Sequence, residues 1–113
     1  TVLEKEDTIA IYGSNEFAAK AIINANGGFK ESKLGADKIL AVGFDSGALQ
    51  QDAIRKGIFV GSVTQDPVQI GYQAVKLAVA AAKGETVKDV DTGSKWYDAK
   101  NIDSEEIKAL LYE

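Results

Sequence analysis

Residues 38–57 read KILAVGFDSGALQQDAIRKG, and residues 58–65 continue with IFVGSVTQ. Two short apolar stretches therefore flank a segment whose apolar residues recur at helical spacing. Ser46 can cap that helix at its start, and Gly57 can end it. A buried strand, a helix and a second buried strand predict a parallel pair of strands joined by a right-handed crossover.

The same order of elements extends in both directions. Residues 8–13 form another short apolar run, and a helix capped by Ser14 or Asn15 is predicted after it. Its predicted buried face consists of Phe17, Ala18, Ala21, Ile22 and Ala25. Asp66-Pro67 is a strong start signal for a third helix, which ends near Lys83. Three strands that each lead into a helix predict one open, doubly wound α/β domain with a three-layer α/β/α arrangement.

The helix predicted for residues 67–83 has more apolar surface than a small domain needs. A surface helix requires a single apolar stripe about 100° wide, whereas this one carries two. Its clearly polar positions are only Gln69, Gln73, Lys76 and Lys83. One interpretation is an Ala-rich helix packed against its own sheet. The other, which we favour, is contact with a second lobe or subunit outside these residues.

The composition excludes several classes of protein. The chain has 113 residues, of which 45% are hydrophobic and 27% charged, as in ordinary globular proteins. Its 13 Lys and Arg against 17 Asp and Glu give a net charge of -4, which argues against a nucleic-acid partner. The absence of Cys and His excludes thiol chemistry, structural zinc sites and imidazole catalysis, and no cofactor is expected. Beyond residue 84, we expect one more strand within 87–97 and a short helix within 103–111.

Each of the three predicted strands leads to a polar side chain: Asn15, Asp45 and Gln65. In an open α/β sheet, ligands bind beyond the carboxyl ends of the strands. A carboxylate accepts hydrogen bonds from two hydroxyl groups, and an amide both donates and accepts them. The three residues include no nucleophile paired with a base, and Asp45 would repel a phosphate. They therefore predict binding of a neutral sugar or polyol, and no enzymatic activity.

Each of these residues also has a purely structural interpretation. Asn15 can cap the helix after it, Asp45 can cap the helix beginning at Ser46, and Gln65 can be an exposed turn residue. Trp96-Tyr97 can stack on a sugar, or can belong to the core. Four acidic residues occur near the end of the chain: Asp89, Asp91, Asp98 and Asp103. Their spacing differs from that of a calcium-binding loop, so no metal site is predicted there.

Several short motifs occur in a specific order along the chain. YGSNE at residues 12–16 is followed by ILAVGFDS at 39–46 and by SVTQDP at 62–67. KGETV at 83–87 and DTG at 91–93 come next. These segments resemble, in order, the Asn-Asp strand end, the VVGFDG segment, the AQxP element and the KGE…dTG ending of type I periplasmic sugar-binding proteins of the ribose-binding kind. The resemblance extends over nearly all of the chain.

The resemblance implies roles for individual residues. Asn15, Asp45 and Gln65 match the positions at which that family binds ligand hydroxyls, the same three that strand-end reasoning selects. Glu16 stands where the family usually has Asp, and Ser46 where it usually has Gly, which leaves the type of sugar open. Members of the family trap a sugar between two closing lobes and deliver it to the membrane permease of an ABC importer.

The resemblance covers only the final part of such a protein. We therefore expect residues 1–113 to be a single incomplete domain, the C-terminal lobe portion of a two-lobed solute-binding protein. Residues 66–90 or so would be the crossover segment that packs on the missing N-terminal lobe, or on a second copy of the chain. Residues 101–112, with NID and LLY, resemble the ending of lipoprotein members, which implies a periplasmic or extracellular protein anchored to the membrane.

Two other functions share this type of fold. The effector-binding domain of a LacI-type transcription repressor is similar, with DNA-binding helices expected before Thr1. The ending of the chain and Trp96-Tyr97 favour the transport protein over this alternative. A receiver-like signalling domain would use Asp45 as phosphoacceptor, but it needs an acidic pair at the first strand end, where Gly13-Ser14 stands.

Overall fold

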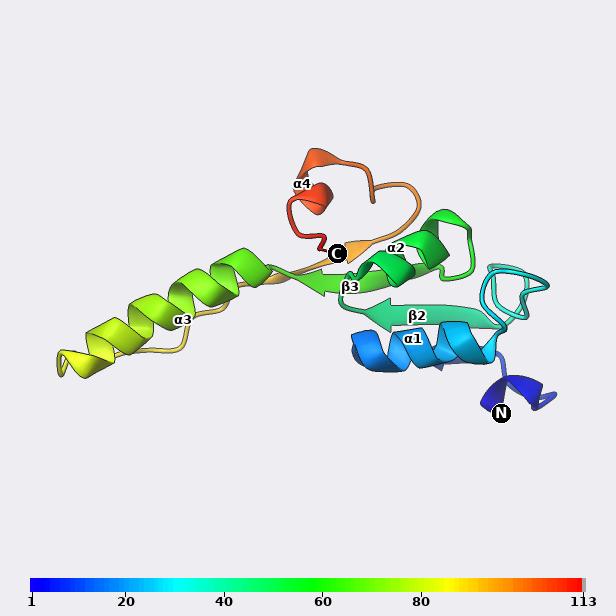
Figure 1. Ribbon diagram of the computed structural model, residues 1–113, viewed down its shortest axis with the longest axis horizontal. Coiled ribbons are helices and arrows are strands. Elements are labelled where there is room, and N and C mark those ends of the chain that lie inside the picture. Colours follow the sequence, from blue (N-terminus) through cyan, green and yellow to red (C-terminus); the bar gives the residue numbers. More distant parts are fainter. Residues whose placement is uncertain (113) are drawn as a thin grey trace.

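The computed structural model describes residues 1–112, which are built around a four-stranded sheet (Figure 1). The strands lie side by side in the order β1-β2-β3-β4. Their bounds are Ala10–Tyr12 for β1, Leu40–Phe44 for β2, Gly61–Gln65 for β3 and Ser94–Tyr97 for β4. β1, β2 and β3 are parallel, and β4 runs antiparallel to β3. The predicted α/β fold with a mainly parallel sheet is confirmed.

Most helices begin where their capping residues predict. The helical segments are η1 (Val2–Glu4), α1 (Glu16–Ala25), α2 (Ala48–Arg55), α3 (Pro67–Ala82) and α4 (Glu105–Lys108). Asn15, Asp66 and Ser104 each accept a backbone N–H of the first turn of α1, α3 and α4, respectively. α2 differs, because its N-cap is Gly47 and the prediction that Ser46 caps it is wrong. The Ser46 hydroxyl instead donates to the carbonyl of Leu110 at 3.2 Å.

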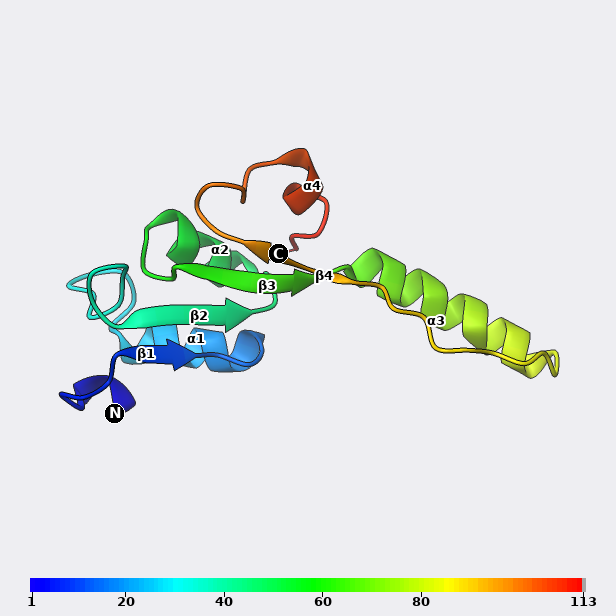
Figure 2. The ribbon, with the colours of Figure 1, turned by 180° about the vertical axis from the view of Figure 1, so that it is seen from behind.

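α1 and α2 cover the same face of the sheet, as the two opposite views show (Figures 1 and 2). β1, β2 and β3 follow one another in a single direction across the sheet. Right-handed crossovers taken in one direction place their helices on one side, so the opposite face carries no helix within residues 1–112. The described residues thus comprise the sheet and one helical layer.

The core lies between this helical layer and the sheet. Its fully buried side chains include Ile23, Ala41, Ala53, Ile54, Phe59 and Tyr97. α1 approaches the sheet closely, because a Cβ on Gly13 would lie 2.7 Å from the backbone nitrogen of Ala19. This contact turns Ala19, Ile22 and Ile23 inward, whereas Phe17 is 83% exposed. The predicted buried face of α1 is therefore largely wrong, because Phe17, Ala21 and Ala25 are exposed and only Ile22 of that set is buried.

α3 projects away from the sheet, and residues 83–93 return beside it to β4 (Figures 1 and 2). We call α3 and residues 83–93 the arm; it stretches the molecule to 57 × 29 × 19 Å. No residue of α3 is buried, so the interpretation that this helix packs on its own sheet is wrong. Within the described residues, no helix is both long and apolar enough to cross a membrane.

Candidate ligand-binding site

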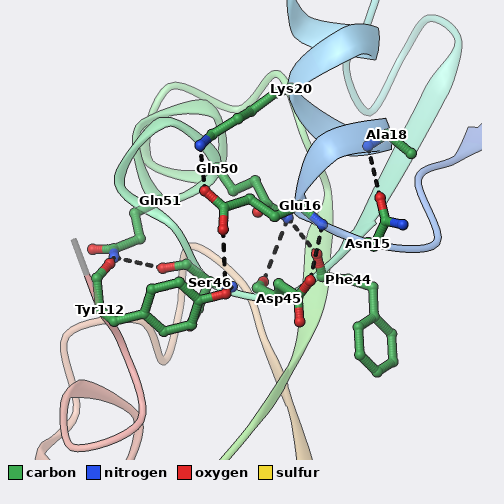
Figure 3. Close-up of polar contacts among 10 residues, drawn as sticks. All are labelled: Asn15, Glu16, Ala18, Lys20, Phe44, Asp45, Ser46, Gln50, Gln51 and Tyr112. Atoms are coloured by element: carbon green, nitrogen blue, oxygen red, sulfur yellow. Dashed lines mark hydrogen bonds and ion pairs between the residues drawn. The ribbon is translucent and has the colours of Figure 1, made fainter. Parts of the chain in front are cut away.

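The carboxyl ends of β1, β2 and β3 carry the three residues selected from the sequence. Asn15 lies between β1 and α1, Asp45 directly follows β2, and Gln65 is the last residue of β3. β2 pairs in parallel with both β1 and β3, so the three residues lie along the same edge of the sheet. Figure 3 shows the polar contacts around Asn15 and Asp45 at this edge.

Asn15 caps α1 and keeps its amide nitrogen available. Its Oδ1 accepts the backbone N–H of Ala18 at 2.8 Å, so its structural interpretation is confirmed (Figure 3). The side chain is exposed, and its Nδ2 has no hydrogen-bond partner in residues 1–112. Capping uses the oxygen of the amide and leaves two N–H groups, so the cap is compatible with donation to a ligand.

Asp45 spans two elements. Its backbone continues from β2, while its carboxylate Oδ2 accepts the N–H of Glu16, the first residue of α1, at 2.8 Å. The prediction that Asp45 can cap the helix after it is therefore wrong, because the carboxylate binds the start of the neighbouring helix. The carboxylate thereby satisfies one of the backbone N–H groups that have no partner inside the helix at its N-terminus. Its second oxygen, Oδ1, has no donor among the described residues and can accept from a ligand.

Gln65 and Asp45 line the same cavity. This cavity has a volume of about 230 Å³ and is completed by Pro67, Ile70 and Tyr112. The side chain of Gln65 is exposed and makes no hydrogen bond within residues 1–112. The cavity therefore has a carboxylate and an amide at the sheet edge, with apolar surface from the start of α3 beside them.

Tyr112 was not among the residues predicted for the site. Gln51 Nε2 donates to the carbonyl of Tyr112 at 2.8 Å. The Tyr112 hydroxyl lies 3.5 Å from both Glu16 Oε2, to which it donates, and the Ser46 nitrogen, from which it accepts (Figure 3). Burial raises the pKa of Tyr112, and the carboxylates of Asp45 and Glu16 add to this effect, so the hydroxyl stays protonated. No helical or strand periodicity marks a residue at the chain terminus, so sequence reasoning had no signal for it.

Residues 98–112, which we call the C-terminal segment, are attached to the same edge by buried hydroxyl groups. Thr64 Oγ1 donates to Ser46 Oγ at 2.9 Å, and Ser46 in turn donates to Leu110. Ser46 and Thr64 are both fully buried, one after β2 and the other inside β3. Ser46 thus joins two strand ends to the C-terminal segment, which carries Tyr112 into the cavity wall.

The two neighbouring aromatic residues have different environments. Tyr97 is fully buried, and its hydroxyl donates to the carbonyl of Asp45 at 2.8 Å, so its ring is not available to a sugar. Trp96 lies across Gly61 on the uncovered face of the sheet, where a Cβ on that glycine would overlap the indole ring. Trp96 Nε1 donates to Asp98 Oδ2 at 3.1 Å. The interpretation that Trp96-Tyr97 belongs to the core is therefore confirmed for Tyr97.

The three residues at this edge offer hydrogen-bond donors and acceptors. Asn15 offers N–H donors, Asp45 offers an acceptor, and Gln65 offers both kinds of group. Neutral hydroxyl groups, which donate and accept at once, match such a set. Within the described residues, no group of three or more acidic side chains is arranged to hold a metal ion.

Comparisons with known proteins place the chain in a family. The family described as "Periplasmic binding protein domain" matches residues 1–86. No curated protein matches the chain. A solved structure from Brachyspira murdochii, described as an ABC transporter and LacI family transcriptional regulator, is 48% identical with a TM-score of 0.85. The match covers 98% of this chain and 37% of that protein.

Two further structures come from Agrobacterium. A solute-binding protein of an ABC transporter from Agrobacterium vitis, solved with D-fucose, is 30% identical with a TM-score of 0.73, over 91% of this chain and 34% of that one. A carbohydrate transporter solute-binding protein from Agrobacterium radiobacter, solved with D-arabinose, is 31% identical with a TM-score of 0.76. That match covers 92% of this chain and 34% of the other. The chain thus spans about a third of their length. These relatives are binding proteins rather than enzymes, and the match over residues 1–86 means that the chain belongs to the periplasmic binding protein domain family.

Proposed function

We propose that this chain forms one side of a sugar- or polyol-binding site in a two-lobed solute-binding protein. The observation that carries the proposal is the edge shared by Asn15, Asp45 and Gln65, where Asp45 and Gln65 line one cavity. The free groups there are the amide N–H groups of Asn15, the Oδ1 of Asp45 and the amide of Gln65. The D-fucose and D-arabinose bound by two structural relatives support a monosaccharide as the ligand.

Binding in this proposal depends on closure of two lobes. Ligand hydroxyl groups exchange water for fixed polar partners, and closure of the second lobe removes the ligand from solvent. The arm, which includes the crossover segment of residues 66–90, would pack on the N-terminal lobe. The exposed apolar surface of α3 supports this packing, because an unpaired apolar stripe of this size marks an interface.

Delivery to a membrane permease completes the proposed role. The two Agrobacterium relatives belong to transporters, and the family description points to a periplasmic or extracellular location. In the intact protein, we propose a lipid anchor that keeps the binding protein near its permease. The net charge of -4 is consistent with a partner other than nucleic acid.

A second candidate is the effector-binding domain of a LacI-type repressor. The description of the Brachyspira murdochii relative names both a transporter and a LacI family regulator. The same residues would bind a sugar in either protein, so the site does not separate the two roles. The gene sequence upstream of Thr1 does: a lipoprotein signal identifies the transport protein, and a helix-turn-helix identifies the repressor.

Calorimetry on the two-lobed protein that contains this chain tests the proposal. A panel of D-fucose, D-arabinose and related monosaccharides should include at least one ligand that binds. Asp45→Asn should weaken that binding at least about tenfold, because the variant loses a charged acceptor. Asp52→Asn is the matched control, since Asp52 is exposed on α2 and its carboxylate has no partner within residues 1–112.

Two results would overturn the proposal. One is the failure of every sugar and polyol in the panel to bind the two-lobed protein. The other is equal affinity in the Asp45→Asn and Asp52→Asn variants. The isolated 113-residue chain should bind the same sugar far more weakly, because it supplies only one side of the site.

A further inference from the structure

Asp45 adopts a backbone conformation that residues with a side chain rarely take. Its φ is +76°, in the left-handed region, where among residues 1–112 the only other non-glycine residue is Glu31. Aspartate enters this region more readily than most residues, but for any residue other than glycine it is still less favourable than the right-handed region. Contacts with the surrounding residues must therefore hold Asp45 in this conformation. Asp45 is also the site residue whose Oδ1 is free to accept from a ligand.

Three buried side chains converge on the carbonyl oxygen of Asp45. The Tyr97 hydroxyl donates to it at 2.8 Å and the Ser62 hydroxyl at 3.0 Å. Gln50 Nε2 donates at 2.7 Å to the carbonyl of Phe44, the residue before, and at 3.4 Å to that of Asp45. All three donors are fully buried. They come from β4, β3 and α2, so three separate elements bind one carbonyl group.

The remaining polar groups of Asp45 are also bound. Its N–H donates to the carbonyl of Val63 at 2.7 Å, and its Oδ2 accepts the N–H of Glu16 (Figure 3). Only Oδ1 is left without a donor in the described residues. The backbone contacts fix the peptide on each side of the Cα, and the direction of the carboxylate follows from them.

We propose that Tyr97, supported by Ser62 and Gln50, is a positioning residue that holds Asp45 in the left-handed conformation, so that its carboxylate is ready to accept a ligand hydroxyl. The inference rests on the proposed function for its ligand, but the conformational part stands on the contacts alone. Preorganisation raises affinity because a fixed acceptor loses no freedom when the ligand arrives.

Tyr97 is suited to this role at every physiological pH. Burial raises the pKa of its hydroxyl to about 12, so the group remains a proton donor. Its partner across the β3–β4 pair is Ser62, the second donor to the same carbonyl. Tyr97 also belongs to the strand that follows the arm, so the chain returning from the arm directly supports the ligand-binding residue.

The test uses Tyr97→Phe, which keeps the buried ring and removes only the donor. In the two-lobed protein, we expect sugar affinity to fall about twofold to tenfold, the value of one net hydrogen bond. Tyr12→Phe is the control, because Tyr12 is exposed and its hydroxyl has no partner in the described residues. In an Asp45→Ala background, Tyr97→Phe should cause no further loss of affinity, because the carboxylate that it positions is gone.

A second measurement does not depend on the sugar. In the NMR spectrum of the 113-residue chain, the amide proton of Glu16 reports the hydrogen bond to Asp45 Oδ2. Tyr97→Phe and Ser62→Ala should each shift this proton upfield and accelerate its exchange with solvent, whereas Tyr12→Phe should not. Ser62→Ala also serves if Tyr97→Phe does not fold.

The outcomes separate the two proposals. If no sugar binds but the Glu16 proton moves as expected, the proposed function fails and the positioning role of Tyr97 stands. If sugar binds equally well to the wild type, Tyr97→Phe and Ser62→Ala, the positioning role is wrong. It is also wrong if the Glu16 amide proton is unchanged in Tyr97→Phe and in Ser62→Ala. An affinity loss that is equally large in the Asp45→Ala background would also overturn it.

Discussion

The packed region and the arm have comparable shares of apolar residues, but they use them differently. In the packed region, which comprises the sheet, α1, α2 and the C-terminal segment, residues such as Ile23 and Ile54 are at most 1% exposed. In the arm, Val68 and Val75 are more than half exposed, and α3 has no buried residue. The difference indicates that the helix-covered side of the packed region forms a core of its own, and the exposed stripe of α3 supports the proposal that the arm packs on a partner.

The largest expected effect comes from opening a cavity in the packed region. Ile54→Ala should destabilise the chain by about 2 to 5 kcal/mol, because Ile54 is fully buried. The matched change in the arm, Ile70→Ala, should cost less than about 1 kcal/mol, since Ile70 is 40% exposed and Ala favours the helix. Urea unfolding of both variants measures the difference. Equal costs would contradict the division into two regions.

The second largest expected effect is a loss of stability of the packed region at high pH. Burial raises the pKa of Tyr97 to about 12, above the ordinary value of 10. The unfolded chain releases this proton above about pH 10, while the folded chain keeps it, so stability is unaffected below that pH and falls as the pH rises to about 12. The loss from this group should be roughly 2 to 3 kcal/mol. Urea midpoints measured from about pH 9 to 12 should fall less steeply in Tyr97→Phe; an unchanged slope would argue against the burial of this hydroxyl.

A pair of glycine substitutions should change stability in opposite directions. Gly13→Ala should destabilise the chain by about 1 to 3 kcal/mol, because its Cβ would lie 2.7 Å from the backbone of Ala19. Gly71→Ala should stabilise it by about 0.5 to 1 kcal/mol, because no atom lies within 4 Å of the new Cβ and Ala favours a helix. Thermal unfolding gives both values. If Gly71→Ala is destabilising in the two-lobed protein, then a partner approaches the arm at that position.

A substitution on the exposed face of α3 should have the smallest effect on stability but a clear effect on self-association of the chain. Val68, Tyr72, Val75 and Val79 form one exposed stripe along α3. We expect the isolated chain to self-associate through this stripe, and Val75→Lys to make it monomeric while changing its stability by less than about 0.5 kcal/mol. Sedimentation velocity at several concentrations measures this. A wild-type chain that stays monomeric at every concentration would weaken the assignment of the arm as an interface.

Local signals explain why much of the fold was predictable. Asn15 and Asp66-Pro67 mark helix starts through contacts within three or four residues, and such contacts are written in the sequence. The prediction for Ser46 failed because its hydroxyl bonds to Leu110, far along the chain. The buried face predicted for α1 was wrong at Phe17, Ala21 and Ala25, because apolar periodicity alone does not decide which of two neighbouring stripes meets the sheet.

The sequence by itself determined the order of strands and helices, and it placed Asn15, Asp45 and Gln65 at the carboxyl ends of successive strands, because hydrophobic periodicity and capping are local properties. Only the tertiary structure decided how Asp45 is oriented. The Tyr97 hydroxyl that binds its carbonyl is 52 residues away, and Tyr112 reaches the same edge from the end of the chain. The physical reason is that a strained conformation needs several donors from separate elements, and these meet only after the sheet has formed.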